Sequence, residues 1–209
     1  MVRIMFIIYL GCSANQSYSQ GVLFQPEVLV GNRSAMFQHH LEIPVKRNIS
    51  FSNYLLIDSE YNRVENQIYF VRNMLSFKNS EKWRSNIAFG VKNPGIFSTV
   101  SWTYKRLDSE KVLIYTVGVT LQKTLSLEQS LVFKRNLIEF ENYIFQFQLL
   151  VVTNFDFNGY SRGIQQFRFA LQNENFQFGV GVNLDQFNNS TTVLENYGVF
   201  IKMAIQNKS

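Results

Sequence analysis

The sequence predicts an all-β fold, an antiparallel up-and-down transmembrane β-barrel of about 12 strands, with about 10 as the alternative count. Three observations support this prediction. From Trp83 onward, large apolar residues alternate one for one with small or polar residues, and this period is typical of strands with two different faces. The segments between turn signals have the length of a tilted membrane strand, about 9–11 residues. The first residues have the pattern of an export signal.

The clearest alternation lies between Phe176 and Asp185. The same alternation occurs in Trp83 to Lys92 and in Leu113 to Gln122, where Ile114 is the one large apolar residue on the second face. We expect one face of each strand to meet an apolar environment and the other a polar one. In the clearest segment the two faces are Phe176, Phe178, Val180, Val182 and Leu184 against Gln177, Gly179, Gly181, Asn183 and Asp185.

Turn signals divide the mature chain into strand cores whose boundaries hold to within about two to four residues. In chain order the cores are Val22 to Val30, Ala35 to Val45, Ile49 to Asp58, Gln67 to Lys78, Trp83 to Lys92, Ile96 to Arg106, Val112 to Gln122, Leu125 to Lys134, Phe140 to Asn154, Ile164 to Gln172, Phe176 to Asp185 and Asn196 to Ile205. Each core ends where residues that favour turns gather.

The predicted connections alternate in length between the two ends of the barrel. Short turns are expected at Lys46 to Asn48, Asn79 to Lys82, Asp108 to Glu110, Arg135 to Glu139 and Asn173 to Asn175. Longer connections are expected at Ser59 to Asn66, Phe155 to Gly163 and Gln186 to Glu195, with two short ones at Asn93 to Gly95 and Lys123-Thr124. This rhythm is typical of a membrane barrel, and an even strand count brings both termini to one side.

Proline positions agree with this division of the chain. Pro26, Pro44 and Pro94 are the only prolines. We expect them near strand ends or in turns, because a proline cannot donate a hydrogen bond to a neighbouring strand. No strand centre is expected to be broken by one.

Residues 1–19 are predicted to be a cleaved signal peptide and residues 20–209 a single outer-membrane β-barrel domain. Arg3 supplies a positive start, Ile4 to Leu10 is an apolar run, and Ser17 to Ser19 is a small-x-small cleavage site. The apolar run is far shorter than the roughly 20 residues of a membrane-spanning helix.

Composition and charge exclude several functional classes. Cleavage after Ser19 removes Cys12, the only cysteine, so the mature chain has no disulfide or thiolate chemistry. An alternative processing site, Tyr9 to Cys12, is similar to a lipoprotein lipobox. With 46% hydrophobic and 17% charged residues, the chain suits an ordered fold rather than a disordered one. The net charge of +5 comes from scattered single residues, which argues against nucleic acid as a partner.

Alternation alone leaves two interpretations of the apolar face, which could point outward to lipid or inward in a soluble barrel. The polar face has few charges, whereas a solvated face is normally dense in Lys and Glu. A dozen strands would also carry more large apolar side chains than the interior of a small barrel can hold. Both arguments favour the membrane barrel. Aromatic residues near the strand ends favour it as well, because the aromatic girdles of membrane proteins lie there. These residues are Trp83, Trp102, Tyr104, Tyr115, Tyr143 and Tyr197.

Several stretches carry a resemblance to a known group of proteins. They are Ser19-Gln20, Gln25-Pro26-Glu27, Gln165 to Arg168, Phe176 to Gly179 with Asp185 to Phe187, and Asn196 to Ile201. On these residues the chain resembles the small, uncharacterised outer-membrane β-barrel proteins of Bacteroidota-type bacteria. The resemblance implies location and architecture rather than an activity. The chain departs from the usual pattern at its end, where the last alternating residues run into Gln206 to Ser209 without a terminal aromatic residue.

The predicted inner face carries more basic than acidic residues. A basic lumen favours anions. Alternatively, these charges pair with one another and fill a closed barrel. The predicted strand count lies between those of packed barrels and open porins, so it is compatible with either outcome. The candidate lumen-lining residues are Arg72, Arg84, Lys92, Lys105, Glu128, Lys134, Arg168, Asp185 and Lys202.

His40, Glu42 and Ser52 form a second, weaker polar cluster. A hairpin at Lys46 to Asn48 would place Glu42 opposite Ser52 and His40 opposite Tyr54. A serine nucleophile with a histidine base is the minimum for a hydrolase, and the alternative is a structural hydrogen-bond network. We expect no catalytic residue and no cofactor. We also expect no metal, because the chain has no spaced set of His, Cys and carboxylate ligands.

The sequence therefore predicts a non-enzymatic protein of the bacterial outer membrane, an envelope component or a narrow passive channel. Its expected partners are outer-membrane lipid and, during insertion, the barrel-assembly machinery; no protein partner is indicated. Two alternatives are a soluble periplasmic β-barrel that binds an apolar ligand and an outer-membrane lipid hydrolase.

Overall fold

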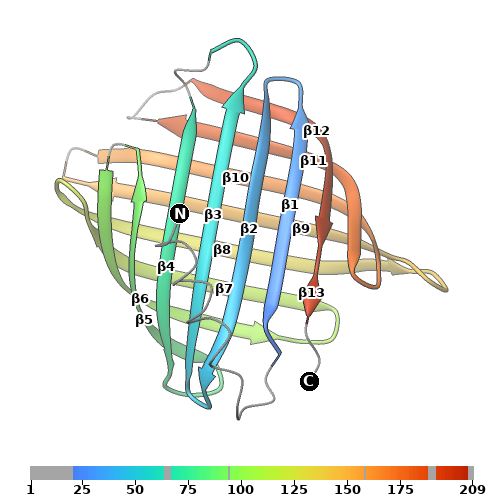
Figure 1. The fold of residues 1–209 in the computed structure, drawn as a ribbon, viewed down its shortest axis with the longest axis horizontal. Coiled ribbons are helices and arrows are strands. Elements are labelled where there is room, and N and C mark those ends of the chain that lie inside the picture. Colours follow the sequence, from blue (N-terminus) through green and yellow to red (C-terminus); the bar gives the residue numbers. More distant parts are fainter. Residues whose placement is uncertain (1–20, 64–66, 94, 158, 188–191, 207–209) are drawn as a thin grey trace, which may run out of the picture.

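The alternating segments form long strands that close into one antiparallel barrel (Figure 1). The computed structural model describes residues 21–63, 67–93, 95–157, 159–187 and 192–206, so the predicted signal peptide lies outside the described residues. The strands are β1 (Leu23–Gly31), β2 (Ser34–Lys46), β3 (Ile49–Glu60), β4 (Ile68–Lys78), β5 (Trp83–Lys92), β6 (Gly95–Leu107), β7 (Lys111–Leu121), β8 (Leu125–Glu139), β9 (Ile144–Asp156), β10 (Gly159–Asn173), β11 (Phe176–Phe187), β12 (Val193–Met203) and the two-residue β13 (Ile205–Gln206).

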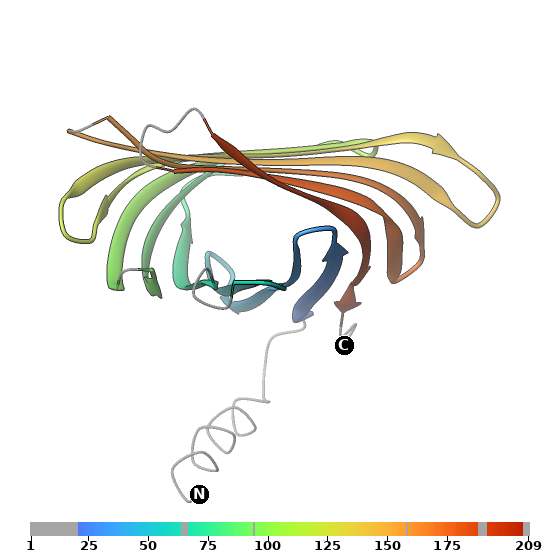
Figure 2. The same ribbon diagram turned by 90° about the horizontal axis from the view of Figure 1, so that it is seen from above.

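Each strand pairs with the next one along the chain, and β12 returns to pair with β1. The prediction of an all-β, up-and-down barrel of twelve long strands is confirmed. Figure 2 looks into the barrel and shows a flattened outline, in which β1 to β3 lie opposite β8 to β11. β1 starts and β13 ends at the same end of the barrel, which we call the terminal end; the opposite one is the loop end.

The two faces of the wall differ as the alternation predicts. On β5, Ile87 and Phe89 point outward and are 54% and 57% exposed, whereas Asn86 and Ala88 point inward and are each 2% exposed. Large apolar residues are likewise exposed on every other long strand except β3, where they are half-buried. This arrangement is the opposite of a soluble barrel with an inward apolar face. Within the described residues, no helix is long and apolar enough to cross a bilayer.

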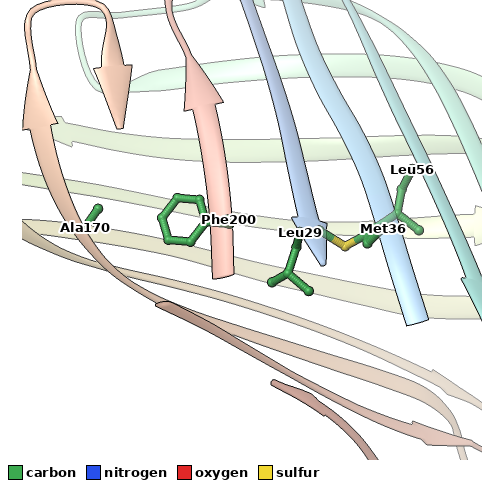
Figure 3. Packing of buried hydrophobic residues seen from close by; sticks show 5 residues of the cluster. All are labelled: Leu29, Met36, Leu56, Ala170 and Phe200. Atoms are coloured by element: carbon green, nitrogen blue, oxygen red, sulfur yellow. The ribbon is translucent and has the colours of Figure 1, made fainter. Parts of the chain in front are cut away.

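A compact apolar cluster fills one side of the interior. It comprises Leu29, Met36, Leu56, Ala170 and Phe200, which are between 0% and 7% exposed (Figure 3). These side chains come from β1, β2, β3, β10 and β12, so the cluster joins walls that face each other in the flattened barrel. Its contacts hold the two walls together, because buried apolar surface is removed from water.

The seam that closes the barrel is interrupted at Pro26. β1 pairs with β12 from Glu27 to Gly31 and with β13 at Leu23 and Phe24, in one continuous register. Between these segments Pro26 has no amide proton to donate. This position, four residues into β1, corrects the expectation that proline avoids strand interiors. Pro44 lies at a register shift between β2 and β3, where proline is tolerated, and Pro94 lies outside the described residues.

Two predicted connections are wrong. The segment Arg135 to Glu139 belongs to β8, which pairs with β9 up to Glu139 and turns at 140–143. The predicted long connection Phe155 to Gly163 is mostly strand, because β9 extends to Asp156 and β10 begins at Gly159. All three strands are therefore longer than their predicted cores, since polar residues near a barrel rim extend the ladder without breaking it.

A short polar ladder interrupts the outward apolar surface. The Nε2 atom of His39 lies 2.7 Å from Oδ1 of Asn53, and Nδ2 of Asn53 donates to Oδ1 of Asn73 at 2.9 Å. The rings of Phe24 and His39 are 5.3 Å apart. The three polar side chains, on β2, β3 and β4, satisfy one another, which lowers the cost of polar groups on an apolar surface.

Candidate functional site

A cavity of about 600 Å³ lies inside the barrel. Near the terminal end it is lined by Leu107, the last residue of β6, and by Val112 on β7. Near the loop end it is lined by Lys92, the last residue of β5, and by Arg162 on β10. The cavity therefore extends along most of the height of the wall, and its volume is that of a typical small-molecule site.

The cavity is lined by seven cationic and three carboxylate side chains. The carboxylates are Glu27, Glu42 and Glu128, and each has an arginine partner. Five of the cations have no carboxylate at ion-pair distance among the described residues, which leaves an excess of positive charge. The cations are Arg72, Lys92, Lys105, Lys134, Arg162, Arg168 and Lys202.

One ion pair crosses the lumen. Arg72 on β4 contacts both carboxylate oxygens of Glu128 on β8, with Nη2 at 2.6 Å from Oε1 and 2.8 Å from Oε2. The Arg72 guanidinium also lies 5.0 Å and 5.2 Å from the ring centres of Phe70 and Phe97. Because β4 and β8 are not neighbours in the sheet, this pair narrows the passage between their walls.

A second ion pair is almost fully buried. Nε of Arg168 on β10 donates to Oε1 of Glu27 on β1 at 2.9 Å, and the side chains are 4% and 3% exposed. Nη1 of Arg168 donates to Oδ1 of Asn183 and to the carbonyl of Phe167, each at 2.9 Å. Arg168 thus joins three strands at a position where an unpaired charge would be costly.

The His40, Glu42 and Ser52 cluster has the predicted register. Glu42 pairs with Ser52 and His40 with Tyr54 across β2 and β3. The side chains make other contacts: Oε1 of Glu42 accepts from Nη1 of Arg84 at 3.3 Å. In the part of the chain that the structure describes, no hydrogen bond joins Ser52 to His40, so the two residues do not form a nucleophile and base pair in this arrangement.

Three lysines gather toward the terminal end. Lys105, Lys134 and Lys202 come from β6, β8 and β12, and all three line the cavity. His40 lies within electrostatic range of each of them. None of the three lysines has an ion-pair partner among the described residues. Alternation predicts the three lysines as separate residues of the inner face. They converge because the flattened barrel brings β6, β8 and β12 to the same part of the cavity.

The loop end of the lumen carries an ion cluster that the sequence did not reveal. Nη2 of Arg33 lies 3.5 Å from Oδ2 of Asp58 and 3.4 Å from Oδ2 of Asp185, and its Nη1 pairs with Glu60. Arg33 belongs to the turn between β1 and β2, where the strand period gives no direction for a side chain. Asp185 therefore lies in this cluster rather than along the main cavity.

Part of the lumen wall is apolar. Ile114, Val132 and Leu150 form one cross-strand row on β7, β8 and β9, and Val152 pairs with Ile164 beside it. All five side chains line the cavity. The predicted inner faces are rich in small residues among few charges, and this apolar row is an exception that the alternation already indicates at Ile114.

Glu27 and Arg162 are cavity residues that the sequence prediction missed. Glu27 alternates with Gln25 and Leu29 on β1, so its inward direction was available from the pattern. Arg162 was hidden because its segment was assigned to a loop. Within the described residues, no group of three His, Cys, Asp or Glu could hold a metal ion.

No protein-family model matches the chain, and the comparison with curated proteins finds no match. Among solved structures, the KdgM porin in complex with disordered oligogalacturonate has a TM-score of 0.52 and 8% identity, covering 89% of this chain and 99% of its own. A bacterial polysaccharide outer membrane secretin has a TM-score of 0.43 and 8% identity, covering 92% and 100% of the two chains. LpxR from Salmonella typhimurium has a TM-score of 0.45 and 8% identity, covering 88% and 99%. The likeness to the KdgM porin shows a shared fold.

Proposed function

We propose that the protein is a non-enzymatic β-barrel of the outer membrane whose lumen passes small anions. The excess of cations over carboxylates along the cavity carries this proposal, because a narrow passage lined by one sign of charge favours ions of the other sign. The outward apolar surface supports the membrane location. The porin with the same fold makes conduction the first activity to test.

The membrane location predicts a strong effect of a charge on the outer wall. Ile87 lies near the middle of β5 and is 54% exposed, so Ile87→Arg would place a guanidinium in the hydrocarbon region. We expect it to destabilise the folded barrel by about 2–4 kcal/mol. The measurement is urea unfolding in vesicles, followed by the difference in gel migration between heated and unheated samples.

Phe157→Arg is the matched control, because Phe157 is 93% exposed and lies between β9 and β10, outside the strands. This variant should unfold at the wild-type urea concentration. Recovery of the wild-type protein in the soluble periplasmic fraction, without heat-modifiable migration, would contradict the membrane location.

Conduction is tested with the purified barrel in a planar bilayer under a potassium chloride gradient. We expect the reversal potential to have the sign of a pore that is more permeable to chloride than to potassium. The double variant Arg72→Ala with Glu128→Ala removes the ion pair that crosses the lumen but leaves the net charge unchanged. It should therefore raise the single-channel conductance severalfold and retain the preference for anions.

The control for this variant is Arg106→Ala with Asp108→Ala, an ion pair between the end of β6 and the turn after it, whose side chains are 61% and 47% exposed. Its conductance should equal that of the wild type. If neither the wild type nor the widened variant conducts, although both are folded in the membrane, the barrel is filled and the proposed channel is wrong.

A further inference from the structure

We infer that the lumenal cavity binds a single-chain anionic amphiphile, a long-chain fatty carboxylate in its simplest form. Lys105, Lys134 and Lys202 would hold the head group, and the apolar row would hold the chain. This inference rests on the proposed function in one respect, that the lumen is accessible from outside. It goes further by naming the class of molecule that the lumen retains.

The lysine cluster supplies the head-group site. Lys134 lies within electrostatic range of both Lys105 and Lys202, and Lys202 within range of Arg168. With Arg84 beside Glu42, this region holds five cations. Among the described residues, the carboxylates that line the cavity there are Glu27 and Glu42, and each is already paired with an arginine. An anionic head group would therefore supply the missing negative charge.

A buried donor of Arg168 that has no hydrogen-bond partner in the described part of the chain also supports an anion site in this region. Nη2 of Arg168 is buried and has no hydrogen-bond partner among the described residues, although its Nε and Nη1 are both satisfied. The Arg168 side chain is 4% exposed and lines the cavity. Buried donors are normally satisfied, so a ligand oxygen is a chemically suitable partner for this group.

The apolar row explains why the ligand has a chain. Val132 lies two residues before Lys134 on the same face of β8, so the row begins next to the head-group site. From Val132 the apolar surface continues through Leu150 to Val152 and Ile164, toward the loop end. An inorganic anion or a small sugar acid would leave this surface against water, whereas a hydrocarbon chain would cover it.

The dimensions of the cavity agree with a single chain. Its volume of about 600 Å³ lies in the range of sites for drug-sized ligands. The Arg72 and Glu128 pair crosses the lumen beyond the apolar row, so it would lie at the far end of the bound chain. The internal apolar cluster occupies part of the same interior, so we expect the cavity to take a single chain rather than the two chains of a diacyl lipid.

The test measures binding of radiolabelled palmitate to the barrel in lipid nanodiscs, corrected for empty nanodiscs. We expect saturable binding that is at least about tenfold tighter than binding of hexadecanol, which has the same chain without the charge. Hexadecyl phosphate should compete with palmitate, because it shares the chain and an anionic head, whereas acetate should not.

The variant Lys105→Met, Lys134→Met, Lys202→Met keeps an unbranched side chain one atom shorter at each position and removes the three charges. It should weaken palmitate binding at least about tenfold. Lys92→Met is the matched control: Lys92 is a lumenal cation without an ion-pair partner among the described residues, but it lies at the loop end. This control should bind palmitate like the wild type.

Two results would overturn the inference: equal binding of palmitate and hexadecanol, or full retention of binding by the triple variant in its folded, heat-modifiable form. Chloride conductance in the same preparation separates the two proposals. A conducting barrel that does not bind palmitate refutes the ligand and leaves the channel. A barrel that binds palmitate and carries no current refutes the channel and supports the ligand.

Discussion

Replacing Arg168 with alanine is expected to destabilise the folded barrel by about 3–5 kcal/mol. The variant leaves the carboxylate of Glu27, 3% exposed, without its 2.9 Å partner. An isolated buried charge loses its hydration without compensation, and the hydrogen bonds to Asn183 and to the Phe167 carbonyl are lost as well. The measurement is the urea midpoint of the heat-modifiable form in vesicles.

Two further variants isolate the cause. Arg106→Ala removes an arginine whose ion pair is largely exposed, and exposed pairs contribute about 0–1 kcal/mol. The double variant Glu27→Gln with Arg168→Met removes both charges and should be more stable than Arg168→Ala, because no unpaired ion stays buried. A double variant that is no more stable than Arg168→Ala would show that lost packing, rather than the lone carboxylate, causes the destabilisation.

Replacing Gly181 with tryptophan is expected to destabilise the folded barrel at least as much as Arg168→Ala does. Even a Cβ atom at Gly181 would lie 2.6 Å from Cδ1 of Leu29 and 3.0 Å from Nη1 of Arg168. An indole ring must therefore displace both the internal apolar cluster and the buried ion pair. Overpacking costs about 1–3 kcal/mol and breaking the pair about 3–5 kcal/mol, so we expect the folded form to become a minor species.

Gly95→Trp is the control for this change, because a Cβ atom at Gly95 meets nothing within 4 Å. The two variants add the same side chain to the inner face, one in the packed region and one near the loop end. Unheated samples from vesicles should show the fast-migrating folded form for Gly95→Trp and mostly the unfolded form for Gly181→Trp. Equal amounts of folded protein would mean that the interior near Gly181 is not tightly packed.

The strands were predictable because their signal is local. Alternation within one segment, as between Phe176 and Asp185, depends only on the geometry of a single strand, and it assigned the inner and outer faces correctly. Where the pattern weakened near the rim, as at Arg135 to Glu139, polar residues were interpreted as turns, although they continue β8. Local periodicity carries no information about how far a ladder extends beyond its apolar core.

The candidate site was only partly predictable because its organisation is not local. Alternation placed Arg72 and Glu128 on inner faces, but their contact depends on how the closed wall is flattened. The convergence of Lys105, Lys134 and Lys202 has the same origin. Arg33 was missed for a different reason, since a turn residue follows neither period, and its direction is set by the acidic residues that it meets.

The position of the closing seam predicts that it forms late in folding. Every other pairing of long strands joins neighbours along the chain, but Glu27 and Lys202 meet from opposite ends of it, so this contact has the greatest loop-closure cost. We expect the ion pair between Arg168 and Glu27 to form only after β1 has paired with β12, at a seam where Pro26 supplies no backbone donor. This ion pair is therefore expected to be absent from the transition state of folding. Its removal should leave the folding rate nearly unchanged and increase the unfolding rate of the barrel.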